Sequence, residues 1–149
     1  INGAFSTPLN VPIIFIQRSL DWDELVALYA RADLCLVTPL IDGMNLVAKE
    51  FVAAKMPNMR GVRPGAVVLS DRAGAAQEMF DALVVNPHCE TAVAKAIIAG
   101  LEMTTEQRWQ ITTSMREALV RNNSESWARS LLNKLEGLEE ITLTKEQVE

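Results

Sequence analysis

Two carboxylates, Asp42 and Glu50, are the residues of this sequence whose type and spacing point most clearly to chemistry. They stand eight positions apart, so Glu50 would lie about two turns inside a helix that opens near Asp42. A carboxylate accepts two hydrogen bonds and suits neighbouring sugar hydroxyls. The spacing therefore predicts one sugar at Asp42 and a ribose at Glu50. The alternative is that Glu50 is a solvated helix residue next to Lys49.

The backbone between the two carboxylates can supply a site for a phosphate or a diphosphate. Gly43 permits a turn without Cβ clashes, so that the amides at the start of the helix can face one ligand. These amides belong to Gly43, Met44, Asn45 and Leu46. Free amides and the helix dipole together favour an anion. The simpler alternative is an Asp42 side chain that caps the helix, with Gly43 in a tight turn.

The elements that would position these residues indicate an α/β fold. Short apolar runs predict strands over residues 12–17, 34–38, 66–70 and 83–86. Helices are expected from Asp21 or Asp23 onward, over residues 44–54, 75–80 and 90–103, from Thr104 or Thr105 to about residue 120, and from Asn123 or Ser124 to just before Gly137. Continuous apolar strands that alternate with helices predict a Rossmann-like parallel sheet with helices on both faces, which ends in two or three helices. In such a sheet, ligands bind beyond the carboxyl ends of the strands, where the turn at Asp42 would lie.

We expect one domain over residues 1–138 and a polar, mobile tail over residues 139–149. The last expected helix carries an apolar stripe, Trp127, Leu131 and Leu135, and two interpretations of it stay open. It packs on the preceding helix, or it is left uncovered. Because the sequence starts with Ile1 rather than Met, we also expect a piece of a longer protein.

Composition and charge narrow the class of protein. With 149 residues, 49% hydrophobic and 22% charged, the chain is typical of a folded domain. Its 19 acidic and 14 basic residues give a net charge of -5, which argues against nucleic acid as a partner. No run approaches the roughly 20 apolar residues of a membrane span, and no secretory signal is visible. Two cysteines make no disulfide framework, so a reduced, cytoplasmic protein is expected.

Other motifs predict no cofactor and no metal. Asp21 and Asp23 match an Asp-x-Asp pattern that binds Mn²⁺ in some enzymes, but capping of a helix is the preferred interpretation. His88 has no second histidine with which to form a metal site. Cys35 is interpreted as a buried hydrophobe, and Cys89 has no basic partner that would make it reactive. No Gly-x-Gly occurs, which disfavours a dinucleotide-dependent oxidoreductase.

The segment ADLCLVTPLIDGMNLVAKEF, residues 32–51, closely resembles the donor-site signature of trehalose-6-phosphate synthases. These are retaining glucosyltransferases with the two-domain GT-B fold. The resemblance continues at residues 1–3, 69–70, 73–78, 85–87 and 127–128, and it extends to about Leu135. It implies that this chain is the C-terminal, donor-binding half of a GT-B fold.

The resemblance also implies a role for each residue of the turn. Asp42 would contact hydroxyls of the donor glucose, and Gly43, Met44 and Asn45 would lie along the glucose and the diphosphate. The amides of Leu46 and Val47 would touch phosphate, and Glu50 would bind the ribose hydroxyls. Backbone near Leu20 would form the wall for the nucleotide base.

The reaction implied by the resemblance moves glucose from UDP-glucose, or another nucleotide-glucose, to glucose 6-phosphate. The products are trehalose 6-phosphate, with retention, and UDP. The family's Arg and Lys pair on the diphosphate and its N-terminal domain would precede Ile1. We therefore expect half a donor site, no acceptor site and no activity from this chain alone.

Three alternatives remain within this class. The parent protein could be a non-catalytic, regulatory homologue that acts as a subunit-interaction module. It could use a different acceptor, such as glycerol 3-phosphate, or form a C–N pseudo-glycosidic bond. The expected partners are a nucleotide-sugar and the N-terminal domain. A homo-oligomer or a synthase complex stays open, and neither nucleic acid nor a membrane is expected.

Overall fold

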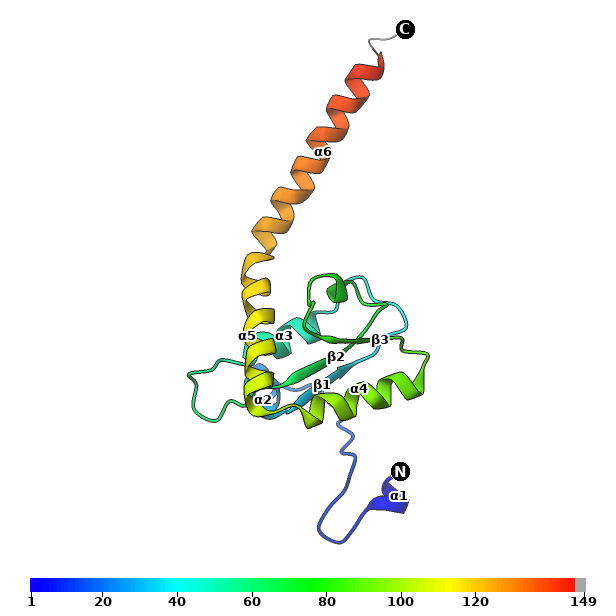
Figure 1. The fold of residues 1–149 in the computed structure, drawn as a ribbon, viewed down its shortest axis with the longest axis vertical. Coiled ribbons are helices and arrows are strands. Elements are labelled where there is room, and N and C mark those ends of the chain that lie inside the picture. Colours follow the sequence, from blue (N-terminus) through cyan, green and yellow to red (C-terminus); the bar gives the residue numbers. More distant parts are fainter. Residues whose placement is uncertain (147–149) are drawn as a thin grey trace.

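The structure is a computed structural model that describes the backbone of residues 1–146 and the side-chain surroundings of residues 1–137. The described part of the chain forms six α-helices, three strands and one 3-10 helix, whose arrangement Figure 1 shows. They are α1 (Asn2–Phe5), α2 (Trp22–Arg31), β1 (Leu34–Val37), α3 (Leu46–Ala54), β2 (Ala66–Ser70), η1 (Gly74–Gln77), β3 (Leu83–Val85), α4 (Glu90–Glu102), α5 (Thr105–Arg121) and α6 (Ser124–Glu146).

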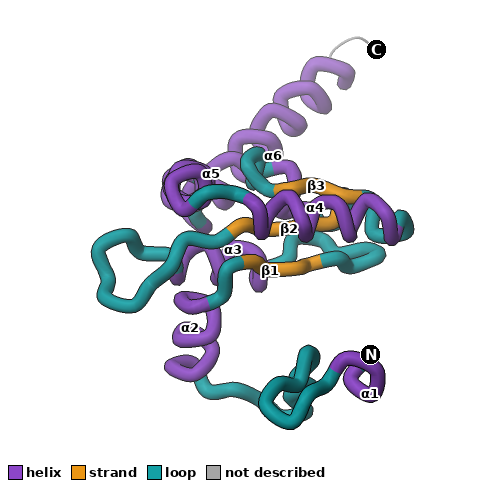
Figure 2. Tube along the Cα trace, turned by 60° about the horizontal axis from the view of Figure 1, so that its bottom comes forward, coloured by secondary structure: helices purple, strands orange, loops and turns teal. Residues whose placement is uncertain are grey.

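The three strands form one parallel sheet in the order β1-β2-β3. Every residue of the central strand β2 is buried, as its unbroken apolar run predicts. In Figure 2 the sheet runs between α4 on one face and α3 on the other. The predicted α/β class and the helices on both faces of a parallel sheet are therefore confirmed.

Alternation along β2 explains how both faces are covered. Ala66 lies on the α4 face, where a Cβ added to Gly100 would come within 3.3 Å of its side chain. Val67 and Leu69 point to the other face and join the main core with Phe51 of α3. Phe51 is 1% exposed, and its burial contributes about 2–3 kcal/mol. The core thus fixes α3 against the sheet, and α3 carries Glu50.

The predicted strand over residues 12–17 is wrong. This segment has no strand pairing, and its apolar side chains are exposed. A strand needs a neighbour whose backbone groups it can bond, and the described residues offer this segment none. The apolar run correctly indicates a surface that favours burial, but the sheet of this chain does not cover it.

The last helix is longer than the sequence predicts. Instead of ending before Gly137, α6 continues to Glu146, and Figure 1 shows it extending away from the sheet. Of the expected mobile tail over residues 139–149, the backbone up to Glu146 is helical, and residues 147–149 lie outside the described part. The boundary at residue 138 and the mobility stay predictions. The helix predicted over residues 75–80 is the shorter η1.

The apolar stripe of α6 is uncovered in the described structure. Trp127 is 61% exposed, and Leu131, Leu132 and Leu135 are also exposed. Of the two interpretations of this stripe, packing on the preceding helix is therefore wrong. Within residues 1–146, no helix combines the length and the apolar character that crossing a membrane requires.

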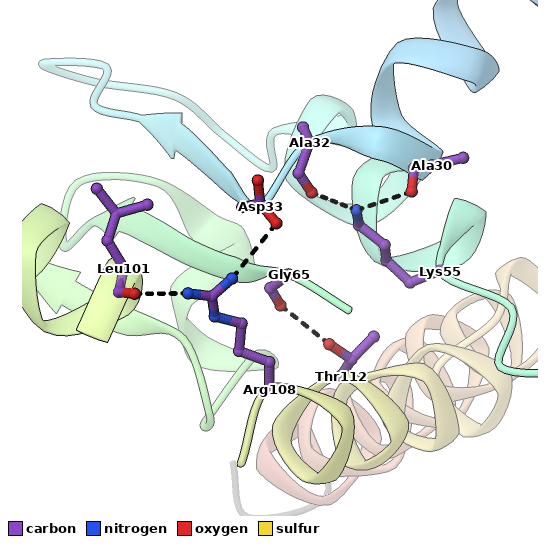
Figure 3. Close-up of polar contacts among 8 residues, drawn as sticks. All are labelled: Ala30, Ala32, Asp33, Lys55, Gly65, Leu101, Arg108 and Thr112. Carbon is purple, nitrogen blue, oxygen red and sulfur yellow. Dashed lines mark hydrogen bonds and ion pairs between the residues drawn. The ribbon is translucent and has the colours of Figure 1, made fainter. Parts of the chain in front are cut away.

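Lys55, the residue after α3, is buried at the amino edge of the sheet (Figure 3). Its Nζ donates to the carbonyl oxygens of Ala32 at 2.5 Å and of Ala30 at 3.4 Å, where α2 ends. The amine also lies 4.5 Å from the centre of the Phe51 ring. Lys55 thereby ties the end of α2 to the end of α3, because the last carbonyls of a helix have no partner within it.

Two side chains of α5 complete this polar cluster (Figure 3). Thr112 donates to the carbonyl of Gly65 at 2.9 Å, and Arg108 donates to the carbonyl of Leu101 at 2.6 Å. Arg108 also lies 3.4 Å from the carboxylate of Asp33. Asp33 and Gly65 directly precede β1 and β2, so the cluster joins α5 to the edge of the sheet where those strands begin. We assign it a structural role, since parallel sheets bind ligands at the opposite edge.

Candidate functional site

The turn that carries Asp42 follows β1 and is bonded to the loop that follows β2. The N–H of Asp42 donates to the carbonyl of Arg72 at 3.1 Å, and the N–H of Gly74 donates back to the carbonyl of Asp42 at 3.0 Å. A third bond, of 2.7 Å, runs from the N–H of Ala75 to the carbonyl of Met44. The turn is therefore held at the carboxyl edge of the sheet by backbone bonds, where parallel sheets bind ligands.

Gly74 allows the two loops to approach this closely. A Cβ at this position would lie 2.2 Å from the carbonyl oxygen of Gly43 and 3.4 Å from the Cα of Met44. Both are backbone atoms, which cannot move aside as a flexible side chain can. Sequence reasoning did not identify Gly74 as a residue that positions the turn. The run of small residues around it, Ala73 to Ala76, was the available signal of a close backbone approach.

The carboxylate of Asp42 turns back onto its own turn. Its Oδ1 accepts the N–H of Met44, and its Oδ2 accepts the side-chain N–H of Asn45, both at 3.0 Å. These hydrogen bonds, with that of Met44 the strongest cause, lower the pKa of Asp42 and favour its ionised form. Each carboxylate oxygen keeps a further lone pair, so Asp42 can still accept from a sugar hydroxyl.

Asn45, rather than Asp42, caps α3. Its side-chain oxygen accepts the N–H of Ala48 at 3.0 Å, which corrects the alternative of an Asp42 cap. Asn45 has a φ of 78°, a left-handed conformation that asparagine tolerates better than most residues. The special backbone geometry expected at Gly43 therefore lies at Asn45. A Cβ on Gly43 would meet nothing within 4 Å.

The set of amides available to a ligand differs from the predicted one. The N–H of Met44 is already bound by Asp42, and the start of α3 is at Leu46 rather than Met44. In the described part of the chain, the N–H groups of Gly43, Leu46 and Val47 donate to no acceptor. Leu46 and Val47 belong to the first turn of α3, whose amides have no partner within the helix. These three amides are the candidate donors for an anion at the positive end of the helix dipole.

Glu50 is half-buried on the next turns of α3, and it does not lie free in solvent. Its Oε2 accepts the hydroxyl of Tyr29, on α2, at 3.3 Å. Burial is the main reason that the pKa of Tyr29 is raised to about 12, and the charge of Glu50 adds to it. Lys49 does not pair with Glu50, because its Nζ contacts Glu78 at 2.6 Å. Sequence reasoning missed Tyr29, which no local pattern connects to Glu50.

Leu20 lies two positions before Trp22, the first residue of α2, and in Figure 2 the N-terminal end of α2 points away from the sheet. No hydrogen bond in the described structure joins Leu20 to the turn. The predicted wall for a nucleotide base at Leu20 therefore stays a prediction.

A cavity of about 620 Å³ borders the turn that carries Asp42. It is lined by Met44 of the turn and Leu46 of α3, by the Lys49–Glu78 ion pair, and by the first turns of α6, including Trp127. The turn thus borders open space on the face where the amides of α3 begin.

The remaining candidates carry no site chemistry. Asp21 caps α2 by accepting the N–H of Glu24 at 2.8 Å, as predicted. Burial raises the pKa of the Cys35 thiol to about 11, which agrees with its interpretation as a hydrophobe. Within the described residues, no three side chains of the His, Cys, Asp and Glu types gather where they could hold a metal ion. The expectation of no metal stays a prediction.

Comparisons with known proteins show what this chain is similar to. The family model described as Glycosyltransferase family 20 matches residues 1–137. The chain is 42% identical over 135 residues to the trehalose-6-phosphate synthase of Sinorhizobium fredii, and 41% identical over 135 residues to that of Mycobacterium leprae. These matches cover 91% of the chain, but 28% and 26% of the two relatives, so the chain spans about a quarter of their length.

Solved structures give the same result in three dimensions. One is the Escherichia coli protein bound with UDP-2-fluoro glucose, with a TM-score of 0.80 and 37% identity over 90% of this chain and 29% of that one. Another is an alpha,alpha-trehalose-phosphate synthase (UDP-forming) from Burkholderia xenovorans in complex with glucose-6-phosphate. It has a TM-score of 0.81 and 39% identity, over 91% of this chain and 29% of that one.

Proposed function

Because the chain belongs to glycosyltransferase family 20, we propose that it is the donor-binding part of a longer UDP-forming trehalose-6-phosphate synthase. The parent enzyme would move glucose from UDP-glucose to glucose 6-phosphate, with retention. Structures of relatives that hold UDP-2-fluoro glucose and glucose-6-phosphate support this choice of substrates. The structural match to a trehalose-6-phosphate synthase, over 29% of that chain, agrees with it.

The observation that carries the proposal is a row of three amides between two carboxylates. The N–H groups of Gly43, Leu46 and Val47 have no acceptor in the described structure, and Asp42 and Glu50 stand on either side of them. Amides at a helix N-terminus bind a diphosphate, while carboxylates repel it and bind neutral hydroxyls instead. The ligand that fits this arrangement has an anionic centre and a sugar with free hydroxyls on each side of it. A nucleoside diphosphate sugar has this chemistry.

Each residue then has a proposed role. Asp42 accepts hydrogen bonds from hydroxyls of the donor glucose. The backbone of Gly43, Met44 and Asn45 lies along the glucose and the diphosphate. The amides of Leu46 and Val47 bind phosphate. Glu50 accepts from the ribose hydroxyls, and backbone near Leu20 contacts the base.

These groups would assist departure of UDP without an enzyme nucleophile. As the glycosidic bond of the donor breaks, negative charge builds on the diphosphate, and fixed N–H donors aimed at it stabilise that charge. In a front-face transfer, the acceptor hydroxyl attacks from the side of the leaving diphosphate, which accepts its proton, and the configuration is retained. Asp42 holds the glucose in place, because its own position is fixed by Met44 and Asn45.

The rest of the parent protein would supply the acceptor site and the basic residues on the diphosphate. The chain covers 26–28% of its curated relatives in the comparisons above, which leaves room for an N-terminal domain. We also propose a homo-oligomer or a synthase complex as a further partner, and a reaction that needs no cofactor. With half a donor site, the 149-residue chain is expected to show no detectable transfer to glucose 6-phosphate.

The proposal predicts that Glu50→Ala weakens binding of UDP to the chain about tenfold, because two hydrogen bonds from ribose hydroxyls to a charged acceptor are lost. A chemical-shift titration with UDP, supported by saturation-transfer NMR, measures weak dissociation constants directly. Asp42→Ala should weaken UDP-glucose by a similar factor and UDP by less, since its partner is the glucose.

Glu102→Ala is the matched control. Glu102 is exposed at the C-terminal end of α4, near the edge where the strands begin and away from the turn. This variant should bind UDP like the wild type. If the wild-type chain binds no UDP, or if Glu50→Ala and Glu102→Ala bind it equally well, the proposed donor site is wrong.

A further inference from the structure

The contact between Tyr29 and Glu50 joins two helices at the edge of the donor site. The Tyr29 hydroxyl donates to Oε2 of Glu50 at 3.3 Å, across 21 positions of sequence. The Tyr29 ring packs edge-to-face on Phe51, with 6.1 Å between ring centres and an interplanar angle of 87°. Since Phe51 is buried in the main core, the ring of Tyr29 is held in place by packing and its hydroxyl has a fixed position.

Glu50 has no other hydrogen-bond donor in the described structure. The nearest basic side chain along the chain, Lys49, is bound to Glu78. A glutamate has three rotatable side-chain bonds, so without a partner its carboxylate would sample several positions. The hydroxyl of Tyr29 is therefore the group that selects one of them.

The hydroxyl of Tyr29 also leaves the carboxylate able to bind a ligand. It uses one acceptor position on Oε2, so Oε1 and the second lone pair of Oε2 stay available. Two acceptors held side by side match the two neighbouring hydroxyls of a ribose. The pKa of Tyr29 is raised to about 12, so the hydroxyl keeps its proton and remains a donor at neutral pH.

We propose that Tyr29 is a positioning residue, which holds the Glu50 carboxylate for the 2′,3′-diol of the nucleotide and so makes the site select ribose over sugars that lack the diol. This inference rests on the proposed function, in which Glu50 binds the ribose. It adds a residue of α2 to a site that otherwise consists of the turn after β1 and α3.

Tyr29→Phe removes the hydroxyl and keeps the ring on Phe51. We expect this variant to bind UDP about threefold more weakly than the wild-type chain, because Glu50 must be ordered when the ligand binds. Binding of 2′,3′-dideoxy-UDP should be the same in both proteins, since this ligand has no diol. Glu50→Ala should weaken the binding of UDP by a larger factor and leave the binding of 2′,3′-dideoxy-UDP unchanged. Adding Tyr29→Phe to Glu50→Ala should change neither affinity further.

The test is to titrate four proteins with both nucleotides by NMR: the wild type, Tyr29→Phe, Glu50→Ala and the double variant. Equal weakening of UDP and dideoxy-UDP by Tyr29→Phe would show a merely structural effect and overturn the inference. It is also overturned if Tyr29→Phe binds UDP like the wild type while Glu50→Ala loses the preference for UDP, and in that case the proposed function stands. If Glu50→Ala keeps the full preference for UDP over dideoxy-UDP, the ribose assignment and the inference both fail.

Discussion

Gly74→Ala is expected to lower the free energy of unfolding by about 3 kcal/mol, the upper end of the usual cost of overpacking. The added Cβ would lie 2.2 Å from the carbonyl oxygen and 2.9 Å from the carbonyl carbon of Gly43. The two loops cannot separate freely, since the N–H of Gly74 itself donates to Asp42 and that of Ala75 donates to Met44. Relief of the clash therefore breaks backbone hydrogen bonds that hold the Asp42 turn. UDP binding should fall below detection together with the stability.

Urea denaturation followed by circular dichroism measures the stability change, and the same UDP titration measures binding. Gly43→Ala is the matched control for stability, because it adds the same methyl group to the facing loop, where a Cβ would meet nothing within 4 Å. Its free energy of unfolding should stay within about 0.5 kcal/mol of the wild type. A Gly74→Ala protein that unfolds at the same urea concentration as Gly43→Ala would show that the close approach of the two loops does not contribute to stability.

The fold could be predicted where a strand's partners lie within this chain. The apolar runs at residues 34–38, 66–70 and 83–86 become β1, β2 and β3, because each has a neighbour in the sheet and helices on its faces. The run at residues 12–17 has the same composition but no neighbour, and it is exposed. Hydrophobicity along a sequence reports a tendency to be buried, whereas strand formation also needs a second backbone at hydrogen-bonding distance.

The candidate site could be predicted to the level of residues but not of individual hydrogen bonds. Asp42 and Glu50 lie on the turn and the helix where their spacing places them. The amide of Met44 was expected to be free, but the Asp42 side chain binds it, as short polar side chains do with nearby backbone. Gly74 and Tyr29 act through contacts with Gly43 and Glu50 that only the folded chain creates. Such contacts across 21 or more positions leave no periodic signal in the sequence.

The second large effect concerns Lys55, at the opposite edge of the sheet. Burial lowers the pKa of its amine to about 8, against about 10.4 for a lysine in an unfolded chain. Between these two pH values, the unfolded chain binds a proton that the folded protein does not. The contribution of Lys55 to stability therefore rises with pH, by about 1 kcal/mol per pH unit in this window, and it is smaller below pH 8, where a charged amine is buried.

Two nearby groups act in the opposite direction and must be separated from Lys55. Burial raises the pKa of Cys35 to about 11 and that of Tyr29 to about 12. The folded protein keeps these protons at pH values where the unfolded chain loses them, so both groups make stability fall as the pH rises. The pH profile of the wild type alone is therefore a sum of opposed contributions. The difference between the wild type and a variant without the Lys55 amine removes the contribution of Tyr29, and that of Cys35 except for the part that the charge of Lys55 itself causes.

Lys55→Met keeps the apolar stem of the side chain and removes its amine. The carbonyl of Ala32 then loses its donor, whereas that of Ala30 keeps the N–H of Arg63, and a buried acceptor without a partner costs about 2 kcal/mol. We expect the variant to lie about 2 kcal/mol below the wild type at pH 9.5 and closer to it at pH 7, in urea denaturation under reducing conditions. Lys95→Met, which removes an exposed amine from α4, should follow the wild type within about 0.5 kcal/mol throughout. If the free energies of unfolding of the wild type and Lys55→Met change in parallel between pH 7 and pH 9.5, the Lys55 amine does not lose its proton in that range. The contribution of the amine to stability would then be the same at both pH values.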